Sequence, residues 1–342
     1  MRVRQRPHQR ESIDDRQAPV AAEAASEHAV QDLNESDVTG ISGRVVARFG
    51  QRYTVALDAD DSVGAAPAEV DAIARGRRMQ IVVGDRARCS REHGSYVIES
   101  VAPRRNLLFR ADADRTKPLA ANVDQIAIVF AAQPPPQPEF AWRALLAASA
   151  AQIASVAILN KTDLESSTAL AALEELARLG ARVLRLSARL DPAGTIAQLE
   201  LVCRDRVTLF VGQSGMGKST LLNLLIDAQL RTGALSRRGT RGRQTTTVTR
   251  WFAYGPHGAV IDSPGFHEFG LSHLSAGDLA RSMSDFAAVS PSCRFANCRH
   301  AEEPDCQVRA AVERGAISRA RYEFYRKLLS QENAIASAQP RR

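Results

Sequence analysis

A short glycine-rich segment, GQSGMGKST, constrains the fold of this 342-residue chain more than any other feature of its sequence. The segment begins at Gly212, follows the apolar run 207–211, and precedes a stretch in which leucines recur at helical spacing. Its pattern, G-x4-G-K-S between a strand and a helix, is that of a phosphate-binding loop. Glycines let backbone N–H groups converge on phosphate oxygens, Lys218 reaches the β- and γ-phosphates, and Ser219 can ligate Mg²⁺. The segment therefore predicts a nucleoside triphosphate site on a parallel α/β sheet.

A second motif, NKTD, lies about fifty residues before the glycine-rich segment. It spans Asn160 to Asp163 at the end of the apolar run 155–159, which is typical of a strand. The carboxylate of Asp163 can accept hydrogen bonds from both N1–H and the exocyclic amine of guanine, whereas adenine presents an acceptor and a donor on that edge. The motif alone is also compatible with a turn or a helix cap. Beside a phosphate loop, it favours a guanine nucleotide over an adenine nucleotide.

Two further strand ends carry polar motifs that complete a guanine nucleotide site. Ser187 and Ala188, in the segment RLSAR, are expected to give backbone contacts to the base. In DSPG, Asp262 can hold Mg²⁺ through water and Gly265 can sense the γ-phosphate. The motifs occur in the order base, base support, phosphate and Mg²⁺, whereas an ordinary P-loop GTPase has the phosphate loop first. A doubly wound domain tolerates such a rearrangement because its ends lie close together, so we predict a circularly permuted GTPase.

Patterns of hydrophobicity divide the chain into four parts, which we expect to be a disordered tail (1–37), an OB-type β-barrel (38–112), a circularly permuted GTPase domain (113–272) and a helical domain with a cysteine-rich interruption (273–342). A barrel of about five strands is indicated by β-branched runs at 43–49, 52–57, 79–89 and 95–101. In the GTPase part, apolar runs alternate with helical stretches, as in a parallel sheet with helices on both faces. A helix is expected around residues 142–151, after a proline-rich loop.

The formal net charge of +7 leans towards an anionic partner such as nucleic acid, although solvated surface charge gives the same value. An RNA-facing surface on the barrel is expected from Arg75, Arg77, Arg78, Arg86, Arg88, Arg91, Arg104 and Arg105. No run of eighteen apolar residues exists, and no apolar core follows the N-terminal arginines. Neither a membrane span nor a secretory signal is therefore expected, and we predict a cytoplasmic protein.

Three of the five cysteines lie within fourteen residues, in the segment CRFANCRHAEEPDC. Three thiolates and one imidazole form a full tetrahedral set for Zn²⁺ with no open position: Cys293, Cys298, His300 and Cys306. A closed site implies a structural metal that contributes folding free energy. The isolated Cys89 and Cys203 are expected to be packing residues. A predicted helix after the cluster carries basic residues that either face phosphate or form a solvated surface: Arg309, Arg314, Arg319, Arg321, Arg326 and Lys327.

In the order of these features, the chain resembles the RsgA (YjeQ, EngC) family of small ribosomal subunit biogenesis GTPases. The shared features run over about residues 38–335: the barrel, NKTD, SA, GQSGMGKST, RGRQTTT, DSPG and the Cys3His set. The resemblance implies an OB-fold, a permuted GTPase domain and a zinc-binding domain. It also implies late-stage maturation of the 30S subunit, contact with 16S rRNA, and ribosome-stimulated hydrolysis of GTP to GDP. We expect a monomer with one structural Zn²⁺ per chain and with Mg²⁺ bound alongside GTP.

Carried over by position, the family motifs imply site residues in this chain. The guanine base would be bound by Asn160, Lys161, Thr162 and Asp163, with support from Ser187 and Ala188. The phosphates would be bound by Gly212, Gln213, Ser214, Gly215, Met216, Gly217, Lys218, Ser219 and Thr220. Asp262 would bind Mg²⁺ through water, and Gly265 would sense the γ-phosphate. Zinc would be held by the Cys3His set named above. Ser263 stands where the family commonly has threonine.

The segment RGRQTTT corresponds to the family's switch loop, in which a threonine closes on Mg²⁺; Thr247 is the first choice and Thr246 the second. The family usually has histidine where this chain has Gln244. Many GTPases place a water-orienting glutamine directly after the D-x-x-G glycine, but here that position is Phe266. We therefore expect Gln244, Thr247 and Lys218 to be the catalytic residues, with Gln244 orienting water through its amide. The alternative is that Gln244 only belongs to a basic switch loop and that a ribosomal group or the γ-phosphate itself handles the proton.

Two other functions share part of this pattern. A P-loop kinase or ATPase would use the glycine-rich segment but has no use for NKTD, and it would bind ATP more tightly than GTP. An RNA-binding assembly factor with little hydrolytic activity would keep the barrel and the zinc module. Lys218, Ser219 and Asp262 are all present, which argues against a loss of chemistry.

Overall fold

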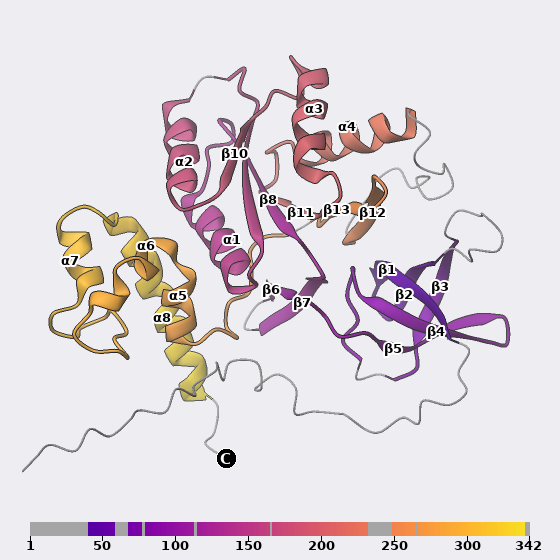
Figure 1. Ribbon diagram of the computed structural model, residues 1–342, viewed down its shortest axis with the longest axis horizontal. Helices are drawn as coiled ribbons and strands as arrows, with labels where there is room; N and C mark the ends of the chain where they lie inside the picture. The colour runs from indigo at the N-terminus through magenta and orange to yellow at the C-terminus, as the bar shows by residue number, and fades with distance from the viewer. Residues whose placement is uncertain are drawn as a thin grey trace, which may run out of the picture. The chain divides into compact units, whose positions relative to one another are not determined.

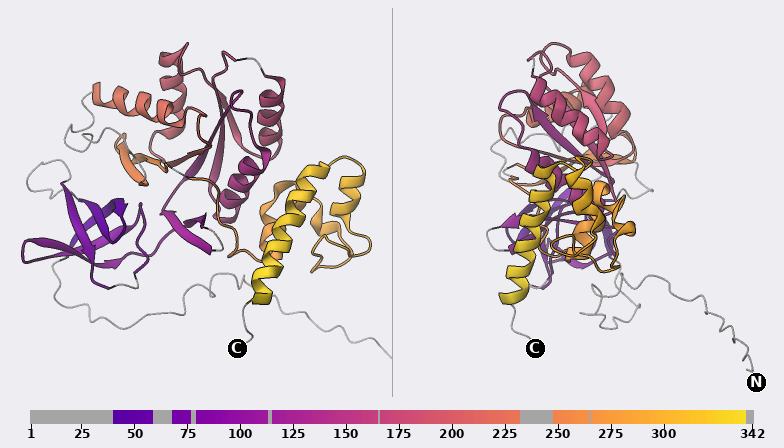
Figure 2. Two further views of the ribbon diagram at one scale, coloured as in Figure 1. Left: turned by 180° about the vertical axis from the view of Figure 1, so that it is seen from behind. Right: turned by 90° about the vertical axis from the view of Figure 1, so that its left-hand side faces the viewer.

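The computed structural model describes residues 40–58, 68–76, 79–112, 115–164, 166–231, 248–264 and 266–338 (Figures 1 and 2). The expected tail at residues 1–37 lies outside these ranges, as do Gln244, Thr246, Thr247 and Gly265. Within the described ranges, strands come first, an α/β part follows, and helices form the end. No helix among the described residues combines the length and the apolar character that a membrane crossing needs.

Five strands close into a small barrel in the first described part (Figure 1). They are β1 (Ile41–Phe49), β2 (Arg52–Leu57), β3 (Glu69–Ala74), β4 (Arg86–Glu92) and β5 (Ser95–Val101). Their order is β1-β2-β3-β5-β4, and β4 returns to pair with β1. β3 and β5 run parallel, whereas the other neighbours are antiparallel. Val45, Val55 and Ile98 point into the core. The predicted five-stranded barrel is confirmed, with the strand order of an OB-type fold.

Two details of the barrel differ from the prediction. The sequence does not predict β3, because only Ala72 among its residues is buried and the others are exposed or half-buried. Conversely, the apolar run 79–83 is not a strand, although most of it is buried. It leads into a turn in which the buried Asp85 carboxylate accepts a hydrogen bond from the backbone N–H of Val82 (2.8 Å). Burial of this run, rather than strand pairing, explains its apolar composition.

Five parallel strands form the centre of the α/β part, in the order β10-β9-β8-β11-β13 (Figure 1). Their bounds are β8 (Gln125–Ala131), β9 (Ala154–Asn160), β10 (Arg182–Arg185), β11 (Val207–Gly212) and β13 (Gly258–Asp262). The strand β12 (Arg250–Tyr254) runs antiparallel beside β13. β8 and β11 are buried along their whole length because helices cover both faces of the sheet. This is the predicted doubly wound fold.

Four helices cover the sheet, two on each face (Figure 1): α1 (Pro138–Ala150) with α2 (Ser167–Arg178), and α3 (Pro192–Cys203) with α4 (Lys218–Arg231). The side chains of Ser166 and Asp191 cap α2 and α3 by accepting hydrogen bonds from backbone N–H groups. Helix α1 begins at Pro138, earlier than the predicted start near Trp142. Proline is compatible with the first helical position because the missing N–H would have no partner within the helix.

A two-stranded hairpin lies between the barrel and the α/β part in the sequence. Its strands β6 (Leu107–Asp112) and β7 (Arg115–Ala121) pair with each other, and Arg110 forms an isolated bridge with Phe269. The sequence does not predict this hairpin, and the expected domain boundary between residues 112 and 113 falls between its two strands. The hairpin matters for the site because it supports the chain that follows β13.

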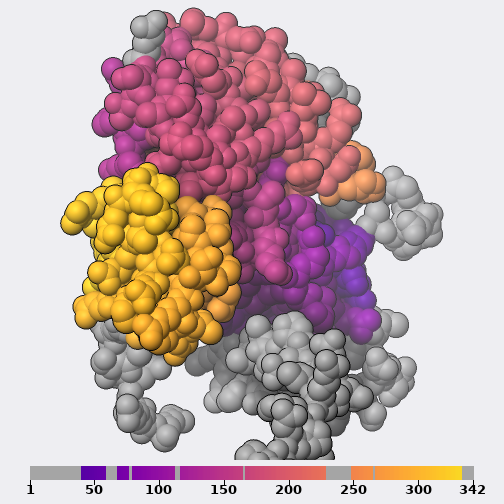
Figure 3. All heavy atoms as spheres, turned by 60° about the vertical axis from the view of Figure 1, so that its left-hand side comes forward, coloured from indigo at the N-terminus to yellow at the C-terminus, as the bar shows by residue number. Residues whose placement is uncertain are grey.

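Helices dominate the chain after Leu271. They are α5 (Ala276–Ser282), α6 (Ser284–Ala287), the 3-10 turn η1 (Ser290–Ser292), α7 (Gln307–Glu313) and α8 (Arg319–Ala338). Ser275 and Asp278 form a reciprocal capping box at the start of α5. Phe286, Phe324 and Tyr325 are buried here, and Figure 3 shows these elements gathered together. The predicted helical part with a cysteine-rich interruption is confirmed.

Candidate functional site

The four predicted nucleotide motifs follow the carboxyl ends of strands in one sheet. NKTD, the glycine-rich segment and DSPG begin at the last residues of β9, β11 and β13, and the Ser187–Ala188 pair follows β10. These strands are parallel to one another, so their carboxyl ends meet at the same edge of the sheet. The permuted chain order therefore leaves the motifs together in space.

Asn160 connects three of these loops. Its side chain is buried, its Nδ2 donates to the carbonyl oxygen of Met216 (3.1 Å), and its Oδ1 accepts from the backbone N–H of Ala188 (3.4 Å). Gly217 has a φ of +88°, and a Cβ added to it would lie 2.2 Å from Asn160 Nδ2, so this position requires glycine. Asn160 thus fixes the base loop against the phosphate loop.

Lys161 adds a second connection between the same loops. Its backbone is in the left-handed region (φ +57°), and its Nζ donates to the carbonyl oxygens of Gln133 (2.8 Å) and Gly215 (2.7 Å). Gln133 belongs to the proline-rich loop between β8 and α1, which the sequence gives no reason to connect with the site. The lysine side chain therefore contacts both the phosphate loop and the proline-rich loop after β8, the strand that lies between β9 and β11.

Asp163 is the carboxylate that the sequence assigns to guanine. Its Oδ1 accepts a hydrogen bond from the Ser187 hydroxyl (2.6 Å), and this bond is the main reason why the pKa of Asp163 lies below its ordinary value. The carboxylate is therefore ionised at neutral pH and keeps lone pairs for the donors of a base. From the sequence, only backbone contacts are expected of Ser187, whereas in the structure its side chain orients Asp163. Thr162 fixes the same loop through two hydrogen bonds to the carbonyl oxygen of Leu186 (both 3.1 Å).

The glycine-rich segment forms the turn between β11 and α4. Gly212 packs so closely on β8 that an added Cβ would lie 2.6 Å from the carbonyl oxygen of Val129. Helix α4 begins at Lys218, so the N–H groups of its first turn have no carbonyl partner within the helix. Ser219 and Thr220 belong to this turn and are exposed. The segment therefore has the backbone arrangement of an anion-binding loop.

Lys218 and Asp262 form an ion pair at the end of the sheet. Lys218 Nζ contacts Asp262 Oδ1, and the two side chains are 11% and 14% exposed. The pair brings together the cation assigned to the phosphates and the carboxylate assigned to Mg²⁺. Ser263, the next residue, is buried, and its hydroxyl oxygen lies 3.3 Å from that of Thr249.

Phe266 occupies the position where many GTPases have a glutamine, and it faces the protein interior. It is 6% exposed, and its ring packs against the rings of Phe140 (6.1 Å between centroids) and Phe269 (4.6 Å). The side chain has no polar group, so another residue or a partner must orient an attacking water. The candidates from the sequence, Gln244 and Thr247, lie outside the described residues.

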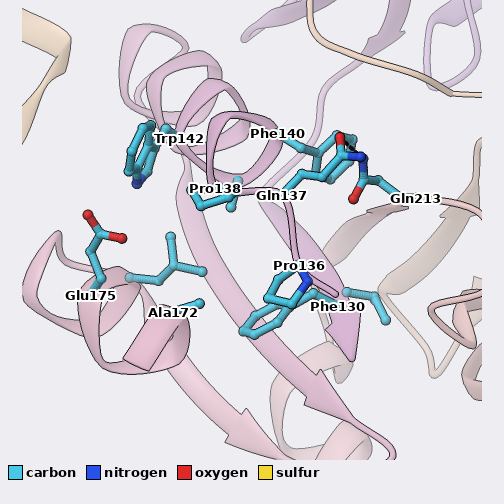
Figure 4. Close-up of a pocket in the computed structure, with 12 residues that line it drawn as sticks. Phe130, Pro136, Gln137, Pro138, Phe140, Trp142, Ala172, Glu175 and Gln213 are labelled. Carbon is cyan, nitrogen blue, oxygen red and sulfur yellow. Dashed lines mark hydrogen bonds between the residues drawn. The ribbon is translucent and has the colours of Figure 1, made fainter. Parts of the chain in front are cut away.

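A small hollow lies beside the second residue of the phosphate loop (Figure 4). Apolar side chains of β8, α1 and α2 form most of its lining, and Gln213 is the residue that it shares with the glycine-rich segment. In Figure 4, Gln213 meets Gln137, to whose Oε1 it donates a hydrogen bond. Neither Asp163 nor Lys218 lines the hollow, so it is separate from the nucleotide site. It shows instead that the phosphate loop contacts the start of α1.

The cysteines and the histidine predicted to bind zinc come together between η1 and α7. One ligand atom from each of Cys293, Cys298, His300 and Cys306 lies within 4.8 Å of the others. His300 Nδ1 is 3.6 Å from Cys293 Sγ and 3.5 Å from Cys306 Sγ. Burial, together with the neighbouring thiols, raises the pKa of Cys298 to about 12, so thiolates at this place require a compensating cation. Three thiolates and one imidazole are a donor set that fits Zn²⁺.

A serine orients the imidazole of His300. Ser290 Oγ donates to the carbonyl oxygen of Phe286 (2.8 Å) and lies 3.2 Å from His300 Nε2. Because the hydroxyl proton is already used, Nε2 carries the ring proton, and Nδ1 presents a lone pair to the thiols. Burial lowers the pKa of His300, which keeps the ring neutral and able to bind a metal.

Polar groups outside the Cys3His set hold its loop in shape. The Glu303 carboxylate accepts hydrogen bonds from the backbone N–H groups of Arg299, Ala301 and Glu302, at 2.9 to 3.2 Å. Although burial acts in the opposite direction, these donors lower the pKa of Glu303 to about 2. The hydroxyl of Tyr325 donates to the carbonyl oxygen of Arg299 (2.7 Å). Helix α8 thereby contacts the loop that carries the Cys3His set directly.

The basic residues assigned to RNA differ in their surroundings. Acidic partners engage four of them on the barrel side: Arg75 with Glu92 and Glu99, Arg86 with Asp58, Arg104 with Asp85, and Arg105 with Asp124. Arg88 and Arg91 are exposed, whereas Arg77 and Arg78 lie outside the described residues. On α8, Arg321 is buried and pairs with Asp285 (3.1 Å), so the expectation that it can face phosphate is wrong.

Comparisons with known proteins agree with this arrangement. A family model described as RsgA GTPase matches residues 101–272. The small ribosomal subunit biogenesis GTPase RsgA of Paraburkholderia phytofirmans is 40% identical over 308 residues, which cover 87% of this chain and 95% of that protein. The protein of the same name from Bordetella pertussis is 44% identical over 301 residues, which cover 86% of this chain and 97% of that protein.

Two solved structures share the fold. The crystal structure of YjeQ from Thermotoga maritima has a TM-score of 0.62 at 26% identity, and the match covers 89% of this chain and all 100% of that chain. The structure of YloQ, described as a circularly permuted GTPase, also has a TM-score of 0.62, at 22% identity, with 91% of this chain and 100% of that chain covered. The permuted fold predicted from the order of the motifs is therefore confirmed.

Proposed function

This chain belongs to the RsgA family of small ribosomal subunit biogenesis GTPases, and from that premise we propose that it binds the 30S subunit and hydrolyses GTP to GDP and phosphate during late maturation of that subunit. The observation that carries the proposal is the junction of the base loop with the phosphate loop. Asn160 and Lys161 both contact the glycine-rich segment, at Met216 and Gly215. One guanine nucleotide would span the two loops.

Each loop has a separate task in this proposal. Asp163 accepts hydrogen bonds from the guanine edge, and Ser187 keeps the carboxylate in place. Lys218 and the backbone N–H groups of residues 213–220 bind the phosphates. Ser219 and Asp262 are the side chains that would hold Mg²⁺. When bound, this ion supplies positive charge for the oxygens on which charge develops during phosphoryl transfer.

We assign one structural Zn²⁺ to the Cys3His set. Four protein ligands leave no open position for a substrate, which supports a structural rather than a catalytic role. The ordering of His300 by Ser290 supports the same assignment, because outer hydrogen bonds of this kind fix metal-binding imidazoles. The metal would hold the loop between η1 and α7 against α8.

The macromolecular partner in this proposal is 16S rRNA within the 30S subunit. Arg88 and Arg91 on β4 offer exposed guanidinium groups for phosphate contacts. A ribosomal partner places the protein in the cytoplasm, where thiols remain reduced and available to zinc. We further propose that the protein acts as a monomer and that its domains have the boundaries expected from the sequence, except the boundary between residues 112 and 113, because the β6–β7 hairpin spans it.

Binding to 30S particles is expected to weaken steeply as the salt concentration rises. If arginines contact rRNA phosphates, counterions are released on binding. A plot of the logarithm of the association constant against the logarithm of the salt concentration should then have a negative slope of several units. Removal of both exposed guanidinium groups in an Arg88→Ala/Arg91→Ala variant is expected to reduce that slope by about 1 to 2. Sedimentation with purified 30S particles at a series of salt concentrations measures the slope.

Arg178→Ala provides the matched control, because this exposed arginine lies at the end of α2 and not on the barrel. Its slope should equal that of the wild type. A flat salt response of the wild type would assign the binding to protein contacts rather than to rRNA.

GTP turnover with and without 30S particles tests the proposed reaction. We expect 30S particles to raise the single-turnover rate of the wild type, and we expect Gln244→Ala to be slower than the wild type. The amide of Gln244 does not titrate near neutrality, so the wild-type rate should show no step attributable to this residue between about pH 5.5 and 8.5. Gln244→His should add a step with an apparent pKa of about 6 to 7.

The same assay separates the alternatives. Wild-type turnover that does not respond to 30S particles would contradict the proposed function and favour an RNA-binding factor with little hydrolytic activity. Faster hydrolysis of ATP than of GTP would favour an ATPase, although Asp163 would then face a lone pair of adenine. A Gln244→Ala enzyme as fast as the wild type would remove Gln244 from the mechanism.

A further inference from the structure

Arg143 on α1 is a buried cation that has no task in the proposed reaction. Its side chain is 8% exposed, and its Nε lies 3.3 Å from Glu268 Oε2. Its Nη1 donates to the carbonyl oxygen of Phe269 (3.5 Å), and the guanidinium carbon lies 6.0 Å from the ring centre of Phe324. We call residues 266–270 the exit segment, because they lead the chain out of the DSPG loop. Arg143 therefore contacts both the exit segment and α8 of the C-terminal part.

The exit segment is held on its other side by the hairpin. The backbone N–H of Ala111 donates to the carbonyl oxygen of Glu268, and the N–H of Gly270 donates to that of Phe109 (both 3.0 Å). A Cβ added to Gly270 would lie 2.7 Å from the carbonyl oxygen of Arg110, so the hairpin fits tightly against the segment. The exit segment is therefore fixed by backbone hydrogen bonds to the hairpin as well as by its contacts with Arg143.

Helix α1 also contacts both the phosphate loop and α8. At its start, Gln137 accepts the hydrogen bond from Gln213 of the phosphate loop. Further along, the ring of Trp142 packs on that of Phe324 (5.6 Å between centroids), and the guanidinium of Arg321 lies 5.6 Å from the Trp142 ring centre. Arg143, next to Trp142, thus lies where the exit segment, α1 and α8 meet.

The two polar contacts of Arg143 are long, so small movements of the exit segment can form or break them. Distances of 3.3 and 3.5 Å lie at the long end of the range for hydrogen bonds to a charged donor. Glu268 is also half-exposed, which weakens the attraction between the two charges. A buried charge that is held so loosely contributes little to folding stability. Its place between three elements fits a role in setting their relative geometry.

We propose that Arg143 is a positioning residue that couples the DSPG loop to the C-terminal zinc-binding part. The inference rests on the proposed function, because it concerns how nucleotide hydrolysis and 30S binding influence each other. A shift of the DSPG loop upon GTP binding moves the exit segment, and Arg143 transfers this shift to α8. Conversely, a 30S particle that fixes α8 also fixes the exit segment in the geometry for hydrolysis. For the two binding equilibria the effect is reciprocal, since GTP and the 30S particle are linked by one coupling free energy.

Arg143→Met tests this coupling, because methionine keeps much of the apolar contact with Phe324 and removes the charge. We expect the single-turnover rate at saturating 30S particles to fall about ten-fold, within the range of couplings between distant sites. The Kd for GTP and the rate without 30S particles should stay within about two-fold of the wild type, as an effect on coupling alone requires. Arg143→Lys keeps the cation and should recover part of the stimulated rate. Arg178→Met, the same substitution on α2, should behave as the wild type does.

A second readout does not need the ribosomal particle. In the wild type, a non-hydrolysable GTP analogue should change amide hydrogen exchange in α8, and in Arg143→Met this change should be lost. Glu268→Gln alters a half-exposed side chain and keeps the test valid even where Arg143→Met folds poorly. Glu268→Gln should also lower the 30S-stimulated single-turnover rate. The double variant Arg143→Met/Glu268→Gln should be no slower than Arg143→Met alone, because both substitutions remove the same contact.

Full stimulation of Arg143→Met by 30S particles, or additive effects of the two substitutions, would overturn the proposal. Failure of the proposed function gives a different result, since the wild type itself would then show no stimulation. In that case the amide hydrogen exchange of α8 still tests the role of Arg143. If the GTP analogue changes this exchange in Arg143→Met as it does in the wild type, the coupling role is excluded; if the change is absent from Arg143→Met, the role is supported.

Discussion

Replacement of Asp163 by asparagine is expected to weaken GTP binding by about ten- to a hundred-fold, which corresponds to about 1–3 kcal/mol. The carboxylate accepts from two donors of guanine, whereas an amide presents its own N–H groups to one of them. Xanthine has a carbonyl oxygen in place of the exocyclic amine, so xanthosine triphosphate should bind better to Asp163→Asn than to the wild type. Equilibrium titrations with GTP and with xanthosine triphosphate measure both effects.

Asp205→Asn is the matched control for this exchange. Asp205 is exposed and precedes β11, at the opposite end of that strand from the phosphate loop. Its φ of +56° lies in a region that asparagine tolerates well, so the fold should be unaffected. Ser187→Ala removes the hydrogen bond that orients Asp163, together with the one that the Ser187 hydroxyl accepts from the backbone N–H of Leu190 (3.3 Å), and should have an intermediate effect. Unchanged GTP affinity in Asp163→Asn would contradict the assignment of this residue to the base.

Much of the nucleotide site could be predicted from the sequence because its chemistry is local. The glycine-rich segment, its lysine and the NKTD motif each have a short pattern whose spacing follows from the geometry of one turn. The contacts between motifs could not be predicted in this way. Nothing in the sequence joins Lys161 to Gln133, or the Ser187 hydroxyl to Asp163, because these pairs meet only when parallel strands bring their ends together.

The parts of the fold that the sequence analysis misses have a common physical cause. β3 buries only Ala72, so alternation of apolar and polar residues gives almost no signal there. The run 79–83 is apolar because it is buried, and burial alone does not distinguish a strand from an extended loop. Arg321 is a charged residue on a helix and would be expected at a solvated surface. Its guanidinium instead lies against the ring of Trp142 and the carboxylate of Asp285. Tertiary contacts decide each of these cases.

Replacement of Cys298 by serine is expected to remove bound zinc and to unfold the loop between η1 and α7. Structural zinc supplies a large part of the folding free energy of such sites, about 10–16 kcal/mol in zinc-finger peptides at pH 7. The aliphatic hydroxyl of serine is a much weaker ligand than a thiolate, so three remaining ligands would bind the ion poorly. Metal analysis of the purified protein and limited proteolysis of the C-terminal part measure the two effects. GTP affinity should be largely retained, because Asp163 and Lys218 belong to the α/β part and not to the helical C-terminal part.

Two further variants separate a metal ligand from a residue that only supports the site. Cys203→Ala removes a buried thiol of α3 outside the cluster, so it should keep one equivalent of zinc per chain even where it lowers stability. Ser290→Ala leaves all four ligands in place and removes the acceptor that orients His300, so zinc should stay bound but be lost to a chelator at about 10- to 100-fold lower concentration. Stoichiometric zinc in a well-folded Cys298→Ser protein would show that Cys298 is not a ligand. A Ser290→Ala protein that holds zinc as tightly as the wild type would mean that the tetrahedral set orients its own imidazole, with the serine serving only to cap the preceding turn.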